Sequence, residues 1–460
     1  MGILRKLVRE DNFLSLSGNL TIAVLGIAGF ALLARSLSLN VFGEWVLFVT
    51  GGSFIEMFRF GITNTALIRF LSGSEGDIRQ SLIGSNTLIG LAATTVISIL
   101  LFGCNSFFGE AIAAAGYQVF FEWYPFLAFL NLPWNNALVV LQAQRQYGKM
   151  LIVKAMKSGL FFLIVLVHFF FFEMTLEQLV LGLLLVNAIT SFLTLVLGWD
   201  GSRHIIKAKA STNKTLLNFG KYTTFTLIGS NLLRSADTFI ISLSPLGSAA
   251  VALYSIPLKL TELQQIPLRS FVATAFPKMS QASLRGKIDE VKMLFNAYSG
   301  AMTYLFTVMG IFTFVFADYL VLFLSGEQYL SVDPETGTNV VAIVRVFSFY
   351  GLLLPLDRMT GVALDSINKP QVNALKVFVM VVANILGDVL AIFIFESLLL
   401  VAVTTILFTI LGIALGMYFL NKELRLYYRD IFSSGTNFYK SMLNKLSNGR
   451  YTLAHKKENL

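Results

Sequence analysis

The sequence predicts an all-α integral membrane protein with about twelve transmembrane helices. Of its 460 residues, 55% are hydrophobic and only 13% are charged, and the mean hydropathy is +0.72. A soluble globular domain carries about 25% charged residues, so this composition excludes that class. Apolar runs of about 20 residues, long enough to cross a bilayer, recur along the whole chain.

These runs mark twelve expected spans: 14–36, 42–67, 81–103, 117–141, 151–172, 177–199, 216–243, 250–276, 294–317, 339–365, 371–394 and 398–420. Arg5, Lys6 and Arg9 precede the first run, and no small-residue cleavage site follows its apolar core. We therefore interpret the first run as a retained span and not as a removed signal peptide.

The basic residues are distributed unevenly between the two sides of the expected membrane. Most of the 35 Lys and Arg residues lie in the N-terminal arm, in the C-terminal tail and in alternate turns, namely 69–81, 143–157, 200–221, 277–293 and 366–376. The opposite loops contain acidic residues and no basic ones. This asymmetry is typical of the positive-inside rule and places both termini in the cytoplasm. The net charge of +9 is therefore explained by the membrane topology. We expect no nucleic-acid partner.

The residues that usually form metal or catalytic sites are scarce. Cys104 is the single cysteine, and the three histidines are scattered, so a disulfide framework and a cysteine metal site are excluded. A phosphate-cradling glycine-rich loop that ends in Lys-Ser or Lys-Thr is also absent from the sequence, which argues against ATP-driven transport. We expect no cofactor, no metal and no catalytic residue.

The chain also has features of an internal duplication. A basic stretch precedes the first span and another precedes the seventh, and FGEW at 42–45 occupies the same place in its half as VALY at 251–254. We predict an N-terminal lobe of six helices (1–200), a basic cytoplasmic linker (201–215), a C-terminal lobe of six helices (216–420) and a basic cytoplasmic tail (421–460). Six spans per half would make the repeats parallel, with a cavity between the lobes.

Charged residues occur inside the expected spans, where they are costly and usually functional. Four pairs are close in sequence: Glu56 with Arg59, Arg234 with Asp237, Lys259 with Glu262, and Asp357 with Arg358. Members three residues apart share one helix face. Such pairs can line a wet cavity, or they can neutralise each other as structural salt bridges, and the sequence leaves both alternatives open.

The eighth span has the strongest polar pattern. Its polar residues form one stripe along an apolar helix: Ser255, Lys259, Glu262, Gln265 and Arg269. The stripe indicates an interior, water-accessible face. Prolines 257 and 267 in the same span predict kinks or local unwinding.

Several motifs, in this order and spacing, resemble the Wzx-type polysaccharide flippases of the multidrug/oligosaccharidyl-lipid/polysaccharide (MOP) exporter superfamily. They are LLARSL with FGEW at 32–45, FRFGITNTALIRFLS at 58–72, LLRSADTFIIS at 232–242, ALYSIPLKL at 252–260, AFPKMSQ at 275–281 and INKPQVNALKV at 367–377. The resemblance implies two six-helix lobes in a V that cycle between inward-open and outward-open states. It implies a bacterial inner-membrane protein that flips an undecaprenyl-diphosphate-linked oligosaccharide, such as an O-antigen repeat unit, to the outer leaflet. Its partners would be membrane lipid and polysaccharide assembly proteins.

With this cargo, the charged residues acquire predicted roles. Arginine matches phosphate oxygens bidentately, so the predicted diphosphate ligands are Arg59, Arg234, Lys259, Arg269 and Arg358. The predicted sugar contacts are Gln265, Asn64 and Asn231. One of four acidic residues is predicted to exchange a proton or Na⁺ during transport: Glu56, Asp237, Glu262 or Asp357.

Two other functions compete with this interpretation. A multidrug or organic-cation antiporter of the same superfamily would have a similar fold, and the close totals of intramembrane bases and acids do not separate it from a flippase. A membrane glycan-processing enzyme would need catalytic residues in a sizeable outer loop. The largest outer loop, 318–338, has Asp333 and Glu335 beside Pro334, a pattern typical of a turn.

Overall fold

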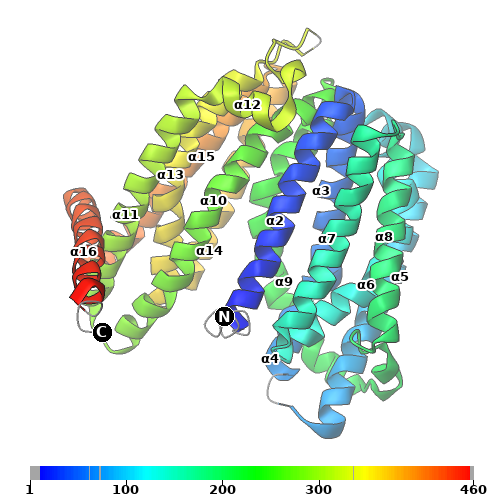
Figure 1. Cartoon of the computed structure of the whole chain (residues 1–460), viewed down its shortest axis with the longest axis horizontal. Coiled ribbons are helices and arrows are strands. Elements are labelled where there is room, and N and C mark those ends of the chain that lie inside the picture. The colour runs from blue at the N-terminus through cyan, green and yellow to red at the C-terminus, as the bar shows by residue number, and fades with distance from the viewer. Residues whose placement is uncertain (1–10, 62, 72–73, 335, 456–460) are drawn as a thin grey trace. The chain divides into compact units, whose positions relative to one another are not determined.

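The computed structural model describes residues 11–61, 63–71, 74–334 and 336–455. The side chains of some further helical positions, including Arg234, lie outside the described residues, as do Arg5, Lys6 and Arg9. Within the described part, every regular element is a helix (Figure 1). The chain divides into two compact units, which are described separately below.

Unit 1 comprises Met1–Ser255 and Phe323–Gln328. Its elements are α2 (Asp11–Ser36), α3 (Leu39–Gly61), α4 (Asn64–Leu71), α5 (Gly76–Ala114), α6 (Gln118–Ala143), α7 (Tyr147–Phe170), α8 (Leu176–Val196), the 3-10 helix η1 (Ser202–Lys207) and α9 (Ala210–Ser242). Helix α2 packs along α7, while α6 packs between α5 and α8. Helix α9 packs against α3, α4 and α5, so it belongs to the core of this unit.

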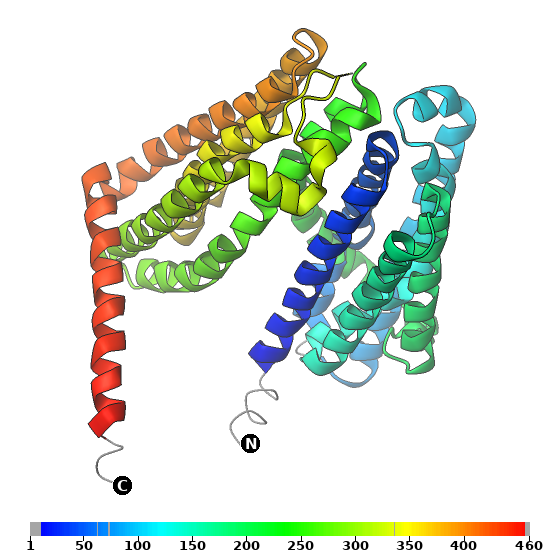
Figure 2. The same ribbon diagram turned by 45° about the horizontal axis from the view of Figure 1, so that its top comes forward.

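Unit 2 comprises Ile256–Leu322 and Tyr329–Leu460. It contains most of α10 (Gly247–Leu284), which continues from unit 1. The remaining elements are α11 (Ile288–Val315), α12 (Ala317–Ser325, whose last residues fall in unit 1), the 3-10 helix η2 (Glu327–Tyr329, whose first two residues fall in unit 1), α13 (Val340–Ser366), α14 (Pro370–Phe393), α15 (Leu398–Leu424) and α16 (Tyr428–His455). Helix α13 packs against α11 and α15, α14 packs against α15, and α16 packs against α11 (Figure 2).

Nine segments of the described chain are long and apolar enough to cross a membrane. They are Leu39–Leu71, which combines α3 and α4, together with α5, α6, α7, α8, α11, α13, α14 and α15. Helix α2 contributes a shorter apolar stretch, Thr21–Ser36. Helices α9 and α10, the expected seventh and eighth spans, are long but contain several charged and many polar residues. The all-helical membrane fold is thus confirmed, and the count of twelve spans stays a prediction.

The boundary between the units lies inside α10, between Ser255 and Ile256. Pro257 follows at once and removes a helical hydrogen-bond donor there. The sequence repeat predicts a different division, with the first lobe ending at residue 200 and the second beginning at residue 216. That division into two six-helix lobes stays a prediction.

Several segments differ from the expected loops. The predicted second span ends as α3 at Gly61, and a separate helix, α4, begins at Asn64. The predicted outer loop 318–338 contains most of α12 and all of η2. The predicted linker contains η1, which packs on α5 because Gly84 has no side chain to collide with the carbonyl of His204. The tail, for which the sequence suggested no structure, forms the long helix α16.

Candidate functional site

Arg59 is the centre of a buried hydrogen-bond network in unit 1. Its side chain is 0% exposed, although it is the last basic residue of the spanning helix α3. The Thr94 hydroxyl accepts from Nε at 3.1 Å and from Nη2 at 2.8 Å, and the Asn131 amide oxygen accepts from Nη1 at 3.0 Å. Nη2 also donates to the carbonyl of Ala128. The protein itself therefore uses the donors of this guanidinium.

Glu56, one turn earlier on α3, takes part in the same network through Asn131. The amide nitrogen of Asn131 donates to Glu56 Oε1 at 2.6 Å. The i,i+3 pair therefore meets through a neutral amide, and no ion pair joins Glu56 to Arg59 among the described residues. Asn131 was not predicted as a site residue, although Asn135 follows it on α6 at the i,i+4 spacing.

Lys157 is a second cation inside unit 1. Helix α7 begins at Tyr147, so Lys157 lies well within this spanning helix. Its ammonium nitrogen lies 4.0 Å from the centroid of the Trp134 ring, a cation–π distance. The Trp134 indole donates in turn to Asn187 Oδ1 at 2.8 Å. Lys157 was not predicted as a site residue because it was counted with the basic turn 143–157, which overlaps the start of the expected fifth span.

The other predicted residues of unit 1 are spread over α4 and α9. Asn64 is half-buried at the start of α4, and its amide oxygen has no hydrogen-bond partner among the described residues. Asn231 is half-buried in α9. The side chain of Arg234 lies outside the described residues. Asp237 is 4% exposed and accepts a hydrogen bond from the Tyr254 hydroxyl at 3.0 Å.

In unit 2, α10 contains the polar stripe that the sequence predicted. Lys259 and Glu262 form a salt bridge of 2.9 Å, and their side chains are 25% and 35% exposed. Gln265 is half-buried on the same helix, and Arg269 is exposed. Ser255, the first residue of the stripe, is buried at the end of unit 1 and donates to the Ala252 carbonyl. The part of the stripe in unit 2 thus begins with a neutralised pair and ends with a cation for which no ion pair is found among the described residues.

Arg269 on α10 and Arg358 on α13 each lie near, in the sequence, a member of one apolar cluster of unit 2. Leu268, which precedes Arg269, belongs to this cluster together with Leu354, one turn before Arg358. Both arginines are exposed, and neither forms an ion pair with a carboxylate that the structure describes. They differ in this respect from Arg59, whose guanidinium donates hydrogen bonds to other groups of the protein.

Asp357 pairs with a lysine that the sequence pattern assigned to the basic turn 366–376. The carboxylate of Asp357 lies 2.6 Å from Lys376 Nζ, and Lys376 is only 3% exposed. Lys376 also donates to the Asp357 carbonyl at 2.7 Å and to the Thr360 hydroxyl at 3.0 Å. This buried pair joins α13 to α14 and leaves the neighbouring Arg358 exposed. A sequence pattern could have indicated that Lys376 is buried. Lys376, Met380, Asn384 and Asp388 recur at four-residue intervals, so they share one face of α14, and all four are buried.

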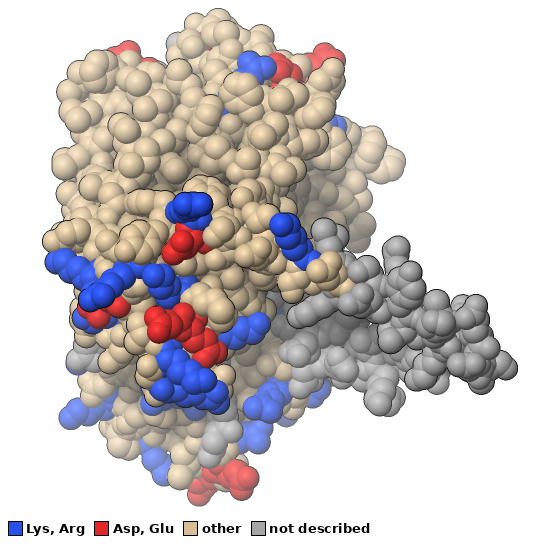
Figure 3. Space-filling view, turned by 90° about the vertical axis from the view of Figure 1, so that its left-hand side faces the viewer, with Lys and Arg blue, Asp and Glu red and all other residues tan. Residues whose placement is uncertain are grey.

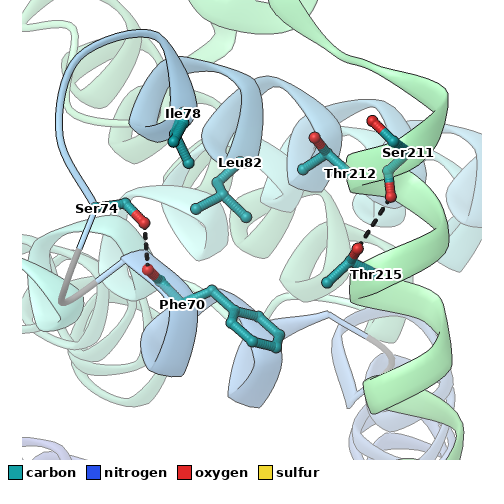
Figure 4. Close-up of a pocket in the computed structure, with 7 residues that line it drawn as sticks. All are labelled: Phe70, Ser74, Ile78, Leu82, Ser211, Thr212 and Thr215. Carbon is teal, nitrogen blue, oxygen red and sulfur yellow. Dashed lines mark hydrogen bonds between the residues drawn. The ribbon is translucent and has the colours of Figure 1, made fainter.

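Unit 1 also contains a small pocket outside the predicted sites (Figure 4). It has a volume of about 240 Å³ and is lined by Phe70, Ser74, Ile78, Leu82, Ser211, Thr212 and Thr215. Two of its hydroxyl groups donate to backbone carbonyls, Ser74 to Phe70 and Thr215 to Ser211. Ligand pockets usually measure roughly 300–1,000 Å³, so this one is too small for an oligosaccharide. In the described part of the chain, no group of three His, Cys, Asp or Glu side chains could hold a metal ion.

Comparisons with solved structures identify the fold. An inward-facing multidrug resistance MATE family transporter of the MOP superfamily matches 87% of this chain and 95% of its own, with a TM-score of 0.71 and 13% identity. The lipid II flippase MurJ, in an inward closed conformation, matches 95% of this chain and 92% of its own, with a TM-score of 0.65 and 13% identity. A MOP superfamily transporter from Pyrococcus furiosus matches 91% of this chain and 97% of its own, with a TM-score of 0.58 and 13% identity.

The family follows from the sequence itself. No curated protein matches the chain. The family described as "Polysaccharide biosynthesis protein" matches residues 8–283, which is more than half of the chain. Together with the transporter fold, this match argues against the enzyme alternative. The chain belongs to the polysaccharide biosynthesis protein family, and its fold is that of the MOP-superfamily transporters.

Proposed function

We propose that this protein flips an undecaprenyl-diphosphate-linked oligosaccharide from the cytoplasmic to the outer leaflet of a bacterial inner membrane by alternating access. In this proposal the chain has twelve spans in two six-helix lobes, and both termini are cytoplasmic. The observation that carries the proposal is the pair of exposed arginines of unit 2, Arg269 on α10 and Arg358 on α13, which form no salt bridge with a described carboxylate. The family match supports a role in polysaccharide synthesis.

The diphosphate is the part of the cargo that most needs the protein. A diphosphate that leaves water requires cations to replace its hydration, and Arg can bind phosphate oxygens with two parallel hydrogen bonds. Arg269 and Arg358 have this capacity because neither forms a salt bridge with a described carboxylate, although Arg358 lies near enough to Asp365 for their charges to interact. Lys259 shares its charge with Glu262, so it would act as a weaker contact. Arg234 remains a candidate phosphate ligand from the sequence.

Arg59 has a different place in this proposal. Its donors are bound to Thr94, Asn131 and the Ala128 carbonyl, and its side chain is fully buried. We therefore assign it to positioning α3 against α5 and α6, and its direct contact with phosphate stays a prediction. The sugars would meet neutral polar groups: Gln265, Asn231 and the unpartnered amide oxygen of Asn64.

Net transport needs an energy source, and we propose that a proton on Glu56 supplies the coupling. Glu262 and Asp357 each form a salt bridge with a lysine. The described hydrogen bond of Glu56 comes from the neutral amide of Asn131. Glu56 is half-buried and accepts from a neutral group, which distinguishes it from the two carboxylates that are paired with lysines. Asp237 and a Na⁺-coupled mechanism are the alternatives that the experiment must separate.

The cargo is tested with purified protein in proteoliposomes that contain a diphosphate-linked glycolipid in one leaflet. We expect wild-type protein to expose the glycolipid to the other leaflet, and Arg269→Gln with Arg358→Gln to lose most of this activity. The matched control is Arg345→Gln, because Arg345 also lies on α13 but is paired with Asp318 at 2.7 Å. Full activity of the double variant would overturn the assignment of these arginines.

Coupling is tested in the same vesicles with an imposed proton gradient or Na⁺ gradient. We expect a proton gradient to accelerate flipping by the wild type and to have no effect on Glu56→Gln. An unchanged response in that variant, or a response to Na⁺ alone, would contradict the proton role of Glu56. Glu173→Gln, a substitution in the exposed turn between α7 and α8, serves as the control.

A multidrug antiporter is the second candidate function, because one multidrug resistance transporter matches the fold with a TM-score of 0.71. Its cargo would be an organic cation, for which exposed arginines are unfavourable partners. The same vesicles loaded with a fluorescent organic cation separate the two functions. Export of this cation without movement of the glycolipid would replace the flippase proposal.

A further inference from the structure

Helix α16, at the end of the chain, has no part in the proposed transport site. It follows α15 after a short turn at Arg425, whose backbone is left-handed (φ 47°). It then crosses α11 and continues beyond the other helices of unit 2 (Figure 2). A helix that crosses the spanning helices cannot run parallel to them through the bilayer. Among the described residues, α16 is also not one of the nine segments that are long and apolar enough to cross a membrane.

One face of α16 is fixed to unit 2. Ile431 is buried in the apolar cluster that includes Val291 and Phe295 of α11. The two helices touch backbone to backbone at Gly300 and Gly435, where an added Cβ on either glycine would collide with the other helix. The Tyr439 hydroxyl also donates to the Ala301 carbonyl at 2.9 Å. These contacts hold the first half of α16 firmly.

The opposite face of α16 is polar, basic and exposed. Its exposed residues include Arg429, Ser433, Asn437, Lys440, Ser441 and Asn444. The whole helix has four Lys or Arg residues against the single acidic residue Asp430. The apolar positions fall on the other side at the helical period, which makes α16 strongly amphipathic. This composition is typical of helices that lie in a membrane interface and bind anionic lipid.

Exposed aromatic rings and cations surround the start of α16. Tyr427, Tyr428 and Phe432 are 66%, 61% and 48% exposed. The Lys292 ammonium lies 5.3 Å from the Tyr427 ring centroid, and Lys422 lies 4.2 Å from that of Tyr418. Aromatic rings with basic neighbours mark the headgroup level of membrane proteins. The face of the molecule seen in Figure 3 likewise has most of its Lys and Arg side chains toward one end, below a broad uncharged band.

We propose that α16 is an interfacial helix whose basic face binds the headgroups of anionic phospholipids. Its apolar side packs on α11, and the exposed ring of Phe432 at the edge of that side enters the outer part of the acyl-chain layer. Arg429 and Lys440 neutralise the phosphates above it. The occupant is lipid and not a protein partner, because the face combines net positive charge with flanking aromatic rings.

The chain's only cysteine, the exposed Cys104, allows a direct test. In a Cys104→Ser background, a fluorophore is attached to a single cysteine at position 432 or 437, and the protein is placed in vesicles of phosphatidylcholine with or without phosphatidylglycerol. We expect nitroxide on shallow acyl positions to quench the label at 432 and aqueous iodide to quench the label at 437. Quenching of both labels by iodide alone, or shielding of both from iodide and nitroxide by another protein copy, would overturn the proposal.

The charge requirement is tested with Arg429→Gln combined with Lys440→Gln. We expect the phosphatidylglycerol-dependent part of the nitroxide quenching at 432 to fall at least several-fold, with no change in pure phosphatidylcholine. Arg285→Gln combined with Lys287→Gln removes two exposed bases from the turn before α11 and is the matched control. Equal quenching with and without phosphatidylglycerol would refute selective binding of anionic lipid. Because the readout is fluorescence, the outcome does not depend on whether the protein flips a glycolipid.

Discussion

Asn131 holds Glu56 and Arg59 together from a different helix: its amide nitrogen donates to Glu56 at 2.6 Å, and its amide oxygen accepts from Arg59 at 3.0 Å. Two charges three residues apart on α3 are thus joined through α6. The neutral amide in this place is a hydrogen-bond partner of both charged groups.

We expect Asn131→Leu to destabilise the protein. The substitution keeps the approximate volume but leaves a buried Arg59 donor and the Glu56 carboxylate without their partner, which costs about 1–3 kcal/mol for each unsatisfied group. A clear fall in the melting temperature of the purified protein in detergent would show this loss. Asn437→Leu, on the exposed face of α16, is the control and should melt like the wild type.

Arg59→Lys should separate stability from cargo binding. A lysine keeps the charge but replaces the planar fork that spans Thr94, Asn131 and the Ala128 carbonyl, so part of the network is lost. We expect a lower melting temperature and, in the protein that remains folded, glycolipid flipping close to the wild type. Loss of flipping at unchanged stability would instead make Arg59 a direct ligand of the cargo.

The buried pair of Lys376 and Asp357 should contribute more to stability than an exposed pair of similar length. Lys376→Met leaves Asp357 without its cation in a poorly hydrated place, and breaking such a pair costs about 3 kcal/mol or more. The matched control is Lys369→Met, which breaks the exposed 2.7 Å pair with Glu423 and should cost about 0–1 kcal/mol. Chemical unfolding of both variants in the same detergent measures the difference, and equal effects would contradict it.

The docking of α16 should depend on the two glycines at its crossing with α11. A side chain at Gly300 collides with the carbonyl of Ile431, and overpacking of this kind costs about 1–3 kcal/mol. We expect Gly300→Leu to release α16 and to raise its rate of cleavage by added protease by about tenfold. Gly103→Leu is the control, because nothing lies within 4 Å of a Cβ at that position. An unchanged cleavage rate would mean that α16 is held by other contacts.

The sequence predicted the fold class for a simple physical reason. Apolar runs of membrane length and a one-sided distribution of basic residues follow from the cost of placing charges in a bilayer, and this cost acts locally on the chain. The Lys259–Glu262 pair was also predictable, because both residues lie on one helix and meet at the i,i+3 spacing.

The partners of the remaining charges were not predictable from spacing. Asp357 pairs with Lys376 of the next helix and not with its neighbour Arg358, and Glu56 meets Arg59 only through an amide of α6. Lys157 and Lys376 were assigned to turns, because charged residues near the end of an apolar run are easily counted with the adjoining turn. The structure places both inside spanning helices.

The sequence by itself therefore determined that this chain is a helical membrane protein of the polysaccharide biosynthesis family, with charged residues inside its spans. Only the tertiary structure decided which of these charges are already satisfied. Arg59 and Lys376 are buried among donors and acceptors from other helices, whereas Arg269 and Arg358 remain exposed. The reason is that membrane insertion depends on the composition of each segment, while the environment of a side chain depends on which distant helix packs against it.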